Sequence, residues 1–232
     1  MPSEEAQATT PRKTTSSTTT SGTTSSDDGH FRRRVAATGL PAELLSRLGD
    51  DAGPADLLAV LRGLAEPPAL PKRGPQVIAV VGERGEATTT ARRLANRLGV
   101  DAAGDAVTAP VSGDEASLVA AQARAHRSVV VAVVEASFDR RELSETVDLL
   151  KALDPQCTVA CVDATRKDGD TRAWLDGWSA HGIGVDAISV SGADVTADPA
   201  TVLGQDVPVL EVDGVPASAA AWFALLMDRI DR

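Results

Sequence analysis

The segment 82–90 combines residue types and a spacing that could bind phosphate groups. It follows a continuous apolar run at 77–81, typical of a strand buried on both faces, and it runs into a predicted helix at 89–98. A strand, a loop and a helix in this order are the setting of the phosphate-binding pattern G-x-x-x-x-G-K-[ST], where loop amides and the helix N-terminus attract anions. The candidate nucleotide contacts here are Gly82, Arg84, Gly85, Ala87, Thr88, Thr89 and Thr90.

The match to this pattern lacks its positively charged residue. When Gly82 takes the first glycine, Ala87 stands at the second glycine and Thr88 at the lysine. Thr89 then stands at the hydroxyl that would hold Mg²⁺ if a nucleotide binds. A lysine would bring a positive charge to the β- and γ-phosphates, whereas Thr88 brings none.

Two carboxylates make the same segment a poor partner for a polyanion. Glu83 and Glu86 lie within it, and a like-charge contact at about 4 Å costs on the order of 4 kcal/mol before screening. Arg84 could offset one of them. The segment therefore predicts at most a modest anion site, and a tight strand-to-helix turn with capping threonines is consistent with the same residues.

The elements that would position this segment alternate along the chain. Further apolar strands are expected at 129–134, 158–162, 185–190 and 207–212, with helices at 115–126, 143–153, 173–180 and 217–230. Strands that alternate with helices of this length indicate βαβ units and a mostly parallel, doubly wound α/β sheet. In such a sheet, ligands bind beyond the carboxyl ends of the strands, where 82–90 falls.

Two shorter regions precede this sheet. Residues 1–34 are predicted to be a disordered tail, because twelve of the thirteen residues from Thr14 to Ser26 are Ser or Thr and nothing there can be buried. Residues 35–71 are predicted to be a small helical unit that ends in a stiff proline linker. The sheet domain is expected to cover 72–232.

Composition excludes several classes of function. The net charge of −10 argues against attraction to nucleic acid, and no apolar run approaches the roughly 18 residues that span a bilayer. Cys157 and Cys161 match neither a disulfide framework nor a zinc spacing, and buried reduced cysteines are expected. The chain contains no nucleophile elbow and no His-Glu-x-x-His. We expect a cytoplasmic protein.

Over residues 38–232, the order of motifs resembles the NG domain of the signal-recognition-particle-type GTPases, and is most like the flagellar-placement GTPase FlhF. Residues 131–138 resemble the strand that ends in D-T-A-G, with Glu135 at the switch-like aspartate and Phe138 at the glycine. Residues 189–196 fall where T-K-x-D-E-T reads guanine; Asp194 and Thr196 match, and Gly192 replaces the lysine. Further similar segments are 40–65, 77–98, 157–167, 206–209 and 213–216.

The resemblance implies a degenerate P-loop GTPase-like protein that is preceded by a small helical unit. Each nucleotide motif has lost an important residue, at Thr88, Phe138 and Gly192, and the stretch 98–129 has no Asp-x-x-Arg. It therefore implies little or no GTP hydrolysis, with no residue assigned a catalytic role. GTP and Mg²⁺ remain the ligands to test, and neither is a certain cofactor.

What remains is a role as a binding or regulatory partner of a cytoplasmic or membrane-associated machine. The resemblance implies a protein partner, either a second copy or a related NG domain, and leaves peripheral membrane contact open. The alternative is a GTP-binding protein with weak residual GTPase activity, in which Asp194 reads guanine. An aspartate at that place is also a common helix N-cap, so both roles of Asp194 stay open.

Overall fold

The computed structural model describes residues 28–99, 107–138 and 143–232. It contains one seven-stranded sheet in the order β2-β3-β1-β4-β5-β6-β7. Each pair of neighbouring strands is parallel except β6 and β7, which are antiparallel. The strands are β1 (Gln76–Gly82), β2 (Val107–Pro110), β3 (Val129–Glu135), β4 (Cys157–Asp163), β5 (Ala187–Ser191), β6 (Val209–Val212) and β7 (Val215–Pro216). The expected mostly parallel α/β sheet is confirmed.

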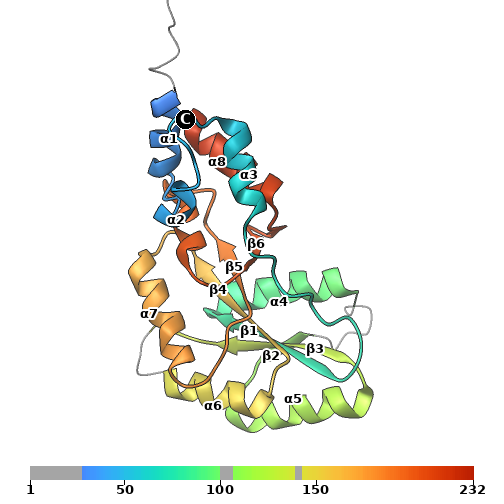
Figure 1. Ribbon diagram of the computed structural model, residues 1–232. Helices are drawn as coiled ribbons and strands as arrows, with labels where there is room; N and C mark the ends of the chain where they lie inside the picture. The colour runs from blue at the N-terminus through green and yellow to red at the C-terminus, as the bar shows by residue number, and fades with distance from the viewer. Residues whose placement is uncertain (1–27, 100–106, 139–142) are drawn as a thin grey trace, which may run out of the picture.

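Helices cover both faces of this sheet (Figure 1). In β1, alternate residues point to opposite faces, so Ile78 and Val80 pack in one core cluster and Val77, Ala79 and Val81 in another. The first cluster includes the buried side of α4 (Arg84–Leu98). The second includes buried residues of α5 (Gly113–His126), α6 (Leu143–Leu153) and α7 (Asp168–Ser179). This is the doubly wound arrangement that the continuous apolar strands predict.

A helical unit lies at one end of the sheet (Figure 1). It contains α1 (Asp28–Ala37), α2 (Ala42–Leu45) and α3 (Pro54–Arg62). The C-terminal helix α8 (Ala219–Asp231) packs against α3 and α1, so the two ends of the described chain meet there. A short 3-10 helix, η2 (Pro199–Gly204), connects β5 to β6.

The structure corrects three expected boundaries. One is the start of α7, which begins at Asp168 instead of residue 173. Helix α1 begins at Asp28, so the last residues of the predicted tail are helical, because Phe31 and Val35 pack into the core there. Residues 1–27, the rest of that tail, lie outside the described residues. Helix α4 begins at Arg84 instead of residue 89, and this difference changes the candidate phosphate site.

Candidate functional site

The carboxyl ends of four parallel strands meet at one edge of the sheet. Gly82 is paired in register with Glu135, and Asp163 is paired with Ser191. Strand β1 lies between β3 and β4, so this is the point at which the strand order reverses. Ligands of doubly wound sheets bind in the crevice at such a point. The candidate residues of the sequence therefore lie where a ligand site is expected.

Residues 84–90 form the first turns of a helix, which corrects the expected loop. Strand β1 ends at Gly82, Glu83 is extended, and α4 begins at the next residue, Arg84. The N–H of Ala87 donates to the carbonyl of Glu83 at 2.9 Å. Alanine favours helical backbone where a glycine would permit a loop, and Ala87 is fully buried against the sheet. The residues that would wrap a phosphate are here wound into α4.

The two glycines of this segment have different surroundings. A Cβ on Gly82 would lie 2.7 Å from the Cβ of Cys161, so the close approach of β1 and β4 requires glycine there. A Cβ on Gly85 would have no atom within 4 Å. The first glycine of the motif therefore has a packing reason that is independent of any phosphate.

The three threonines lie on different sides of α4. Thr88 is half-buried, Thr89 is exposed and Thr90 is buried. The Thr89 hydroxyl donates to the carbonyl of Gly85 at 2.8 Å, so the helix itself engages the group expected to hold Mg²⁺. Among the described residues, no group of three or more His, Cys, Asp or Glu side chains could hold a metal ion.

Two ion pairs lie beside the carboxyl end of β1. A cleft of about 320 Å³ is lined by Glu83, Arg84, Glu135, Ala136 and Ser137. Arg84 binds both carboxylate oxygens of Glu135 through Nε and Nη2, with an Nη2–Oε2 distance of 2.8 Å. This hydrogen bond and the charge of Glu135 raise the pKa of Arg84. Arg166, from the loop after β4, pairs with Glu83.

Aromatic side chains form a stack beside this cleft. The ring of Phe138 stacks on Trp174 with a centroid distance of 4.4 Å, and Trp174 contacts Trp178 at 4.3 Å. The guanidinium of Arg166 also lies over the ring of Phe138, 4.0 Å from its centroid. Arg166 therefore makes two contacts, one with a carboxylate and one with an aromatic face.

Asp194 lies at the same edge, in the loop after β5. It is exposed, and its N–H donates to the carboxylate of Asp213 at 2.9 Å. Arg229 of α8 donates to its carbonyl, which ties the loop to the C-terminal helix. Gly192, at the lysine position of the family motif, has φ +70°, and a Cβ there would lie 3.0 Å from the Oδ1 of Asp163, so a side chain at this position would be strained and crowded.

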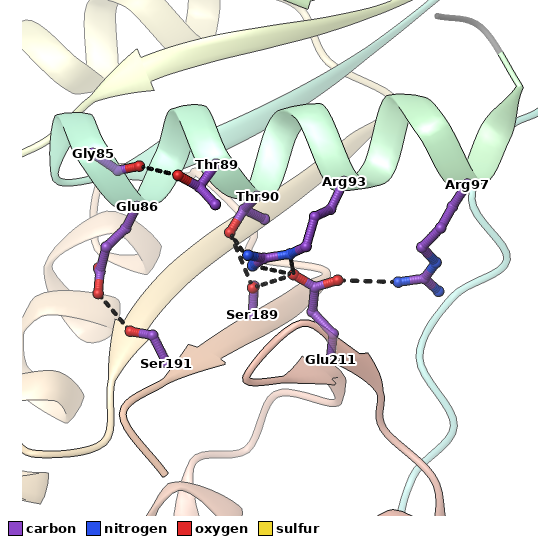
Figure 2. Close-up of polar contacts among 9 residues, drawn as sticks. All are labelled: Gly85, Glu86, Thr89, Thr90, Arg93, Arg97, Ser189, Ser191 and Glu211. Carbon is purple, nitrogen blue, oxygen red and sulfur yellow. Dashed lines mark hydrogen bonds and ion pairs between the residues drawn. The ribbon is translucent and has the colours of Figure 1, made fainter. Parts of the chain in front are cut away.

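Sequence reasoning missed a buried polar cluster beneath α4 (Figure 2). Glu211 of β6 is fully buried and accepts hydrogen bonds from Arg93, Arg97 and Ser189. Thr90 joins the cluster through Ser189 at 3.3 Å and Arg93 at 3.0 Å. The available signal was a single glutamate inside the apolar run 207–212, because a buried carboxylate needs charged or hydrogen-bonding partners.

No protein-family model and no curated protein sequence matches the chain. Solved structures do match it. The signal recognition particle receptor FtsY from Elizabethkingia anophelis, in complex with GDP, has a TM-score of 0.62 at 15% identity, covering 84% of this chain and 83% of that one. The 54 kDa signal recognition particle protein from Aeropyrum pernix K1, in complex with GDP, has a TM-score of 0.60 at 14% identity, covering 86% and 64%.

FlhF complexed with GMPPNP and Mg²⁺ has a TM-score of 0.55 at 14% identity, and the match covers 85% of this chain and 97% of that one. Similarity at such low identity concerns the fold. The chain therefore has a fold like that of the signal-recognition-particle-type GTPase NG domains, as the order of its motifs predicts. In the part of the chain that the structure describes, no helix is both long and apolar enough to span a membrane.

Proposed function

We propose that this protein is a degenerate FlhF-like member of the signal-recognition-particle-type GTPases that hydrolyses little or no GTP and acts as a binding or regulatory partner. One observation carries the proposal: the residues expected to wrap the phosphates form the first turns of α4, without a lysine. Phosphoryl transfer in P-loop proteins depends on positioning and on positive charge at the β- and γ-phosphates. Losing one such electrostatic contact typically lowers the rate by about 10²–10³-fold.

The charges around the cleft support the same proposal. Among the described residues, Arg84 and Arg166 form ion pairs at this cleft, and Glu135 and Glu83 each neutralise one of them. The four side chains sum to zero charge, whereas a triphosphate needs a clear positive excess.

A role in binding another protein has its own support. Val195 and Val215 are 71% and 56% exposed, and both lie beyond the carboxyl ends of β5 and β6. A protein that covered this edge would remove the exposed apolar surface of both valines from water. A second copy or a related NG domain, within a cytoplasmic or membrane-associated machine, is the partner we propose.

The second candidate is a GTP-binding protein with weak residual GTPase activity. The observation that favours it is the exposed carboxylate of Asp194, which stands in a loop held by Asp213 and Arg229. A carboxylate in such a loop could accept hydrogen bonds from the N1 and N2 groups of guanine. GDP, GTP or ATP would then bind with different affinities.

The deciding experiment measures turnover and binding on the purified full chain. We expect no GTP hydrolysis above the buffer rate with Mg²⁺; metal-dependent hydrolysis that disappears in Thr89→Ala would overturn the proposal.

Calorimetry with GTP, GDP and ATP reports binding separately. If millimolar GTP raises the melting temperature and Asp194→Ala abolishes the rise, the protein has kept the guanine recognition that the second candidate requires. Light scattering with and without GTP then separates a nucleotide-dependent dimer from a constitutive one.

A further inference from the structure

The junction between β1 and α4 is tied to the strands on both of its sides. Glu83 and Arg84 are consecutive residues at this junction. Arg84 pairs with Glu135 at the end of β3, and Glu83 pairs with Arg166 in the loop after β4. Because β3 and β4 flank β1, the two ion pairs together cross the crevice at its switch point.

We propose that Glu83 and Glu135 form an autoinhibitory latch, in which their carboxylates occupy the two guanidinium groups that a diphosphate or triphosphate would otherwise bind. The inference rests on the proposed function, since it explains why this NG-like site would be closed to nucleotides. The carboxylates of Glu83 and Glu135 would prevent phosphate groups from binding, and the site should accept phosphate groups when both charges are removed.

The geometry of the Arg84 pair supports this competition. Arg84 presents Nε and Nη2 to the two oxygens of Glu135, and the same planar fork binds two oxygens of a phosphate group. The Arg84 side chain is 75% exposed and that of Glu135 is 34% exposed. The pair lies at the surface, so an anion can take the carboxylate's place without breaking a folding element.

Arg166 has a second contact that would keep it in position without the latch. Its guanidinium lies 4.0 Å from the centroid of Phe138, which in turn stacks on Trp174. Loss of the Glu83 charge therefore leaves this cation held beside the cleft by the aromatic face. Phe138 stands at the glycine position of the family motif. Its ring would hold Arg166 beside the cleft, where the guanidinium could supply the positive charge that the motif's lysine would bring.

The test compares two double variants of the full chain that have the same net charge. Glu83→Gln with Glu135→Gln neutralises both latch carboxylates and changes the net charge from −10 to −8. The control, Asp50→Asn with Asp154→Asn, makes the same change and breaks the ion pairs with Arg32 and Arg124 instead. Both sets of side chains lie at the surface, and circular dichroism melting verifies that each variant folds. Each latch substitution is also made singly, so a folding defect in the pair does not prevent the measurement.

Calorimetry with inorganic pyrophosphate is the first readout, followed by GTP and ATP. We expect the latch variant to bind pyrophosphate with a Kd at least tenfold lower than wild type, equivalent to about 1.4 kcal/mol. Adding Arg84→Ala and Arg166→Ala should remove the gain. Equal gains for pyrophosphate and GTP would support a site for phosphate groups alone, and a larger gain for GTP than for ATP would support one that also contacts the base.

Two results would overturn the latch. One is a latch variant that binds pyrophosphate no better than wild type, and the other is an equal gain in the Asp50→Asn and Asp154→Asn control. Neither result depends on whether the wild-type protein hydrolyses GTP. Failure of the latch and failure of the proposed function are therefore seen in different assays.

Discussion

The fully buried carboxylate of Glu211 accepts two hydrogen bonds from Arg93, at 3.1 Å from Nε and 2.7 Å from Nη2 (Figure 2). Its other oxygen accepts from Nη1 of Arg97 at 3.1 Å. The two arginines lie one turn apart on α4, whereas Glu211 is on β6, 118 residues from Arg93. The cluster therefore fixes the helix of the candidate phosphate site to strands on the far side of β4.

Removal of Arg93 and Arg97 should destabilise the fold more than neutralisation of Glu211. Arg93→Ala with Arg97→Ala leaves a buried charge without a cation, and we expect the free energy of unfolding in urea to fall by about 3–5 kcal/mol. Glu211→Gln should cost less, because each arginine side chain is about one-third exposed and can turn toward water. Arg124→Ala, at an exposed ion pair, is the control and should cost under about 1 kcal/mol. A larger loss of unfolding free energy in Glu211→Gln than in the double arginine variant would contradict this account.

The two glycines near the start of α4 should respond oppositely to alanine. Gly82→Ala places a Cβ 2.7 Å from Cys161, and such overpacking should cost about 1–3 kcal/mol of unfolding free energy. Gly85→Ala meets no atom within 4 Å and adds helix propensity, which should stabilise the protein by about 0.4–1 kcal/mol. Urea unfolding of both variants measures this directly. Destabilisation by Gly85→Ala would indicate that residues 84–88 are not helical.

The two buried thiols should make stability fall in alkaline solution. Burial raises the pKa of Cys157 to about 11 and that of Cys161 to about 12, from an ordinary value of 9.0. Above pH 9 the unfolded thiols lose protons that the folded thiols keep, so the unfolded state binds fewer protons and the free energy of unfolding decreases. The slope should reach about 1.4 kcal/mol per pH unit for each thiol up to about pH 11.

Urea unfolding between pH 8 and 11 measures this slope, and the chain has no tyrosine to titrate in the same range. A variant with Cys157→Ala and Cys161→Ala should start less stable and show a flatter decline. In the native wild type at pH 8, neither thiol should react with a thiol reagent until denaturant is added. Rapid labelling of the folded protein would contradict the buried placement.

Loss of the Phe138 ring should be seen at the tryptophans. Phe138→Ala removes the stacked contact with Trp174 and exposes that indole, so we expect its fluorescence to shift to longer wavelength and stability to fall by about 1–3 kcal/mol. Phe223→Ala, at another half-buried phenylalanine, controls for the lost apolar area. An unchanged emission spectrum in Phe138→Ala would mean that the ring does not cover Trp174.

Much of the architecture follows from local pattern. The runs at 77–81 and 129–134 are strands β1 and β3, because uninterrupted apolar residues suit a strand covered on both faces. The order of the motifs predicted an NG-like fold, although the solved structures with this fold share only about one residue in seven with this chain. Pro54 marks the start of α3, since proline lacks the N–H that a first helical turn leaves unused.

Other features depended on the tertiary structure. The sequence suggested that Glu83 and Glu86 would oppose a bound phosphate, but only the fold shows that Arg166 pairs with Glu83 and that Ser191 donates to Glu86. Helix α4 begins at Arg84 because Ala87 packs on the sheet, a contact that local glycine and threonine patterns do not encode.

The sequence by itself determined the alternation of strands and helices, because the periodicity of apolar residues depends only on neighbours along the chain. It also established that the phosphate motif lacks a lysine, since Thr88 is read directly. Only the tertiary structure decided which charges meet. Arg84 reaches Glu135 across 51 residues and Arg93 reaches Glu211 across 118, and such pairs exist only after packing has brought separate elements together.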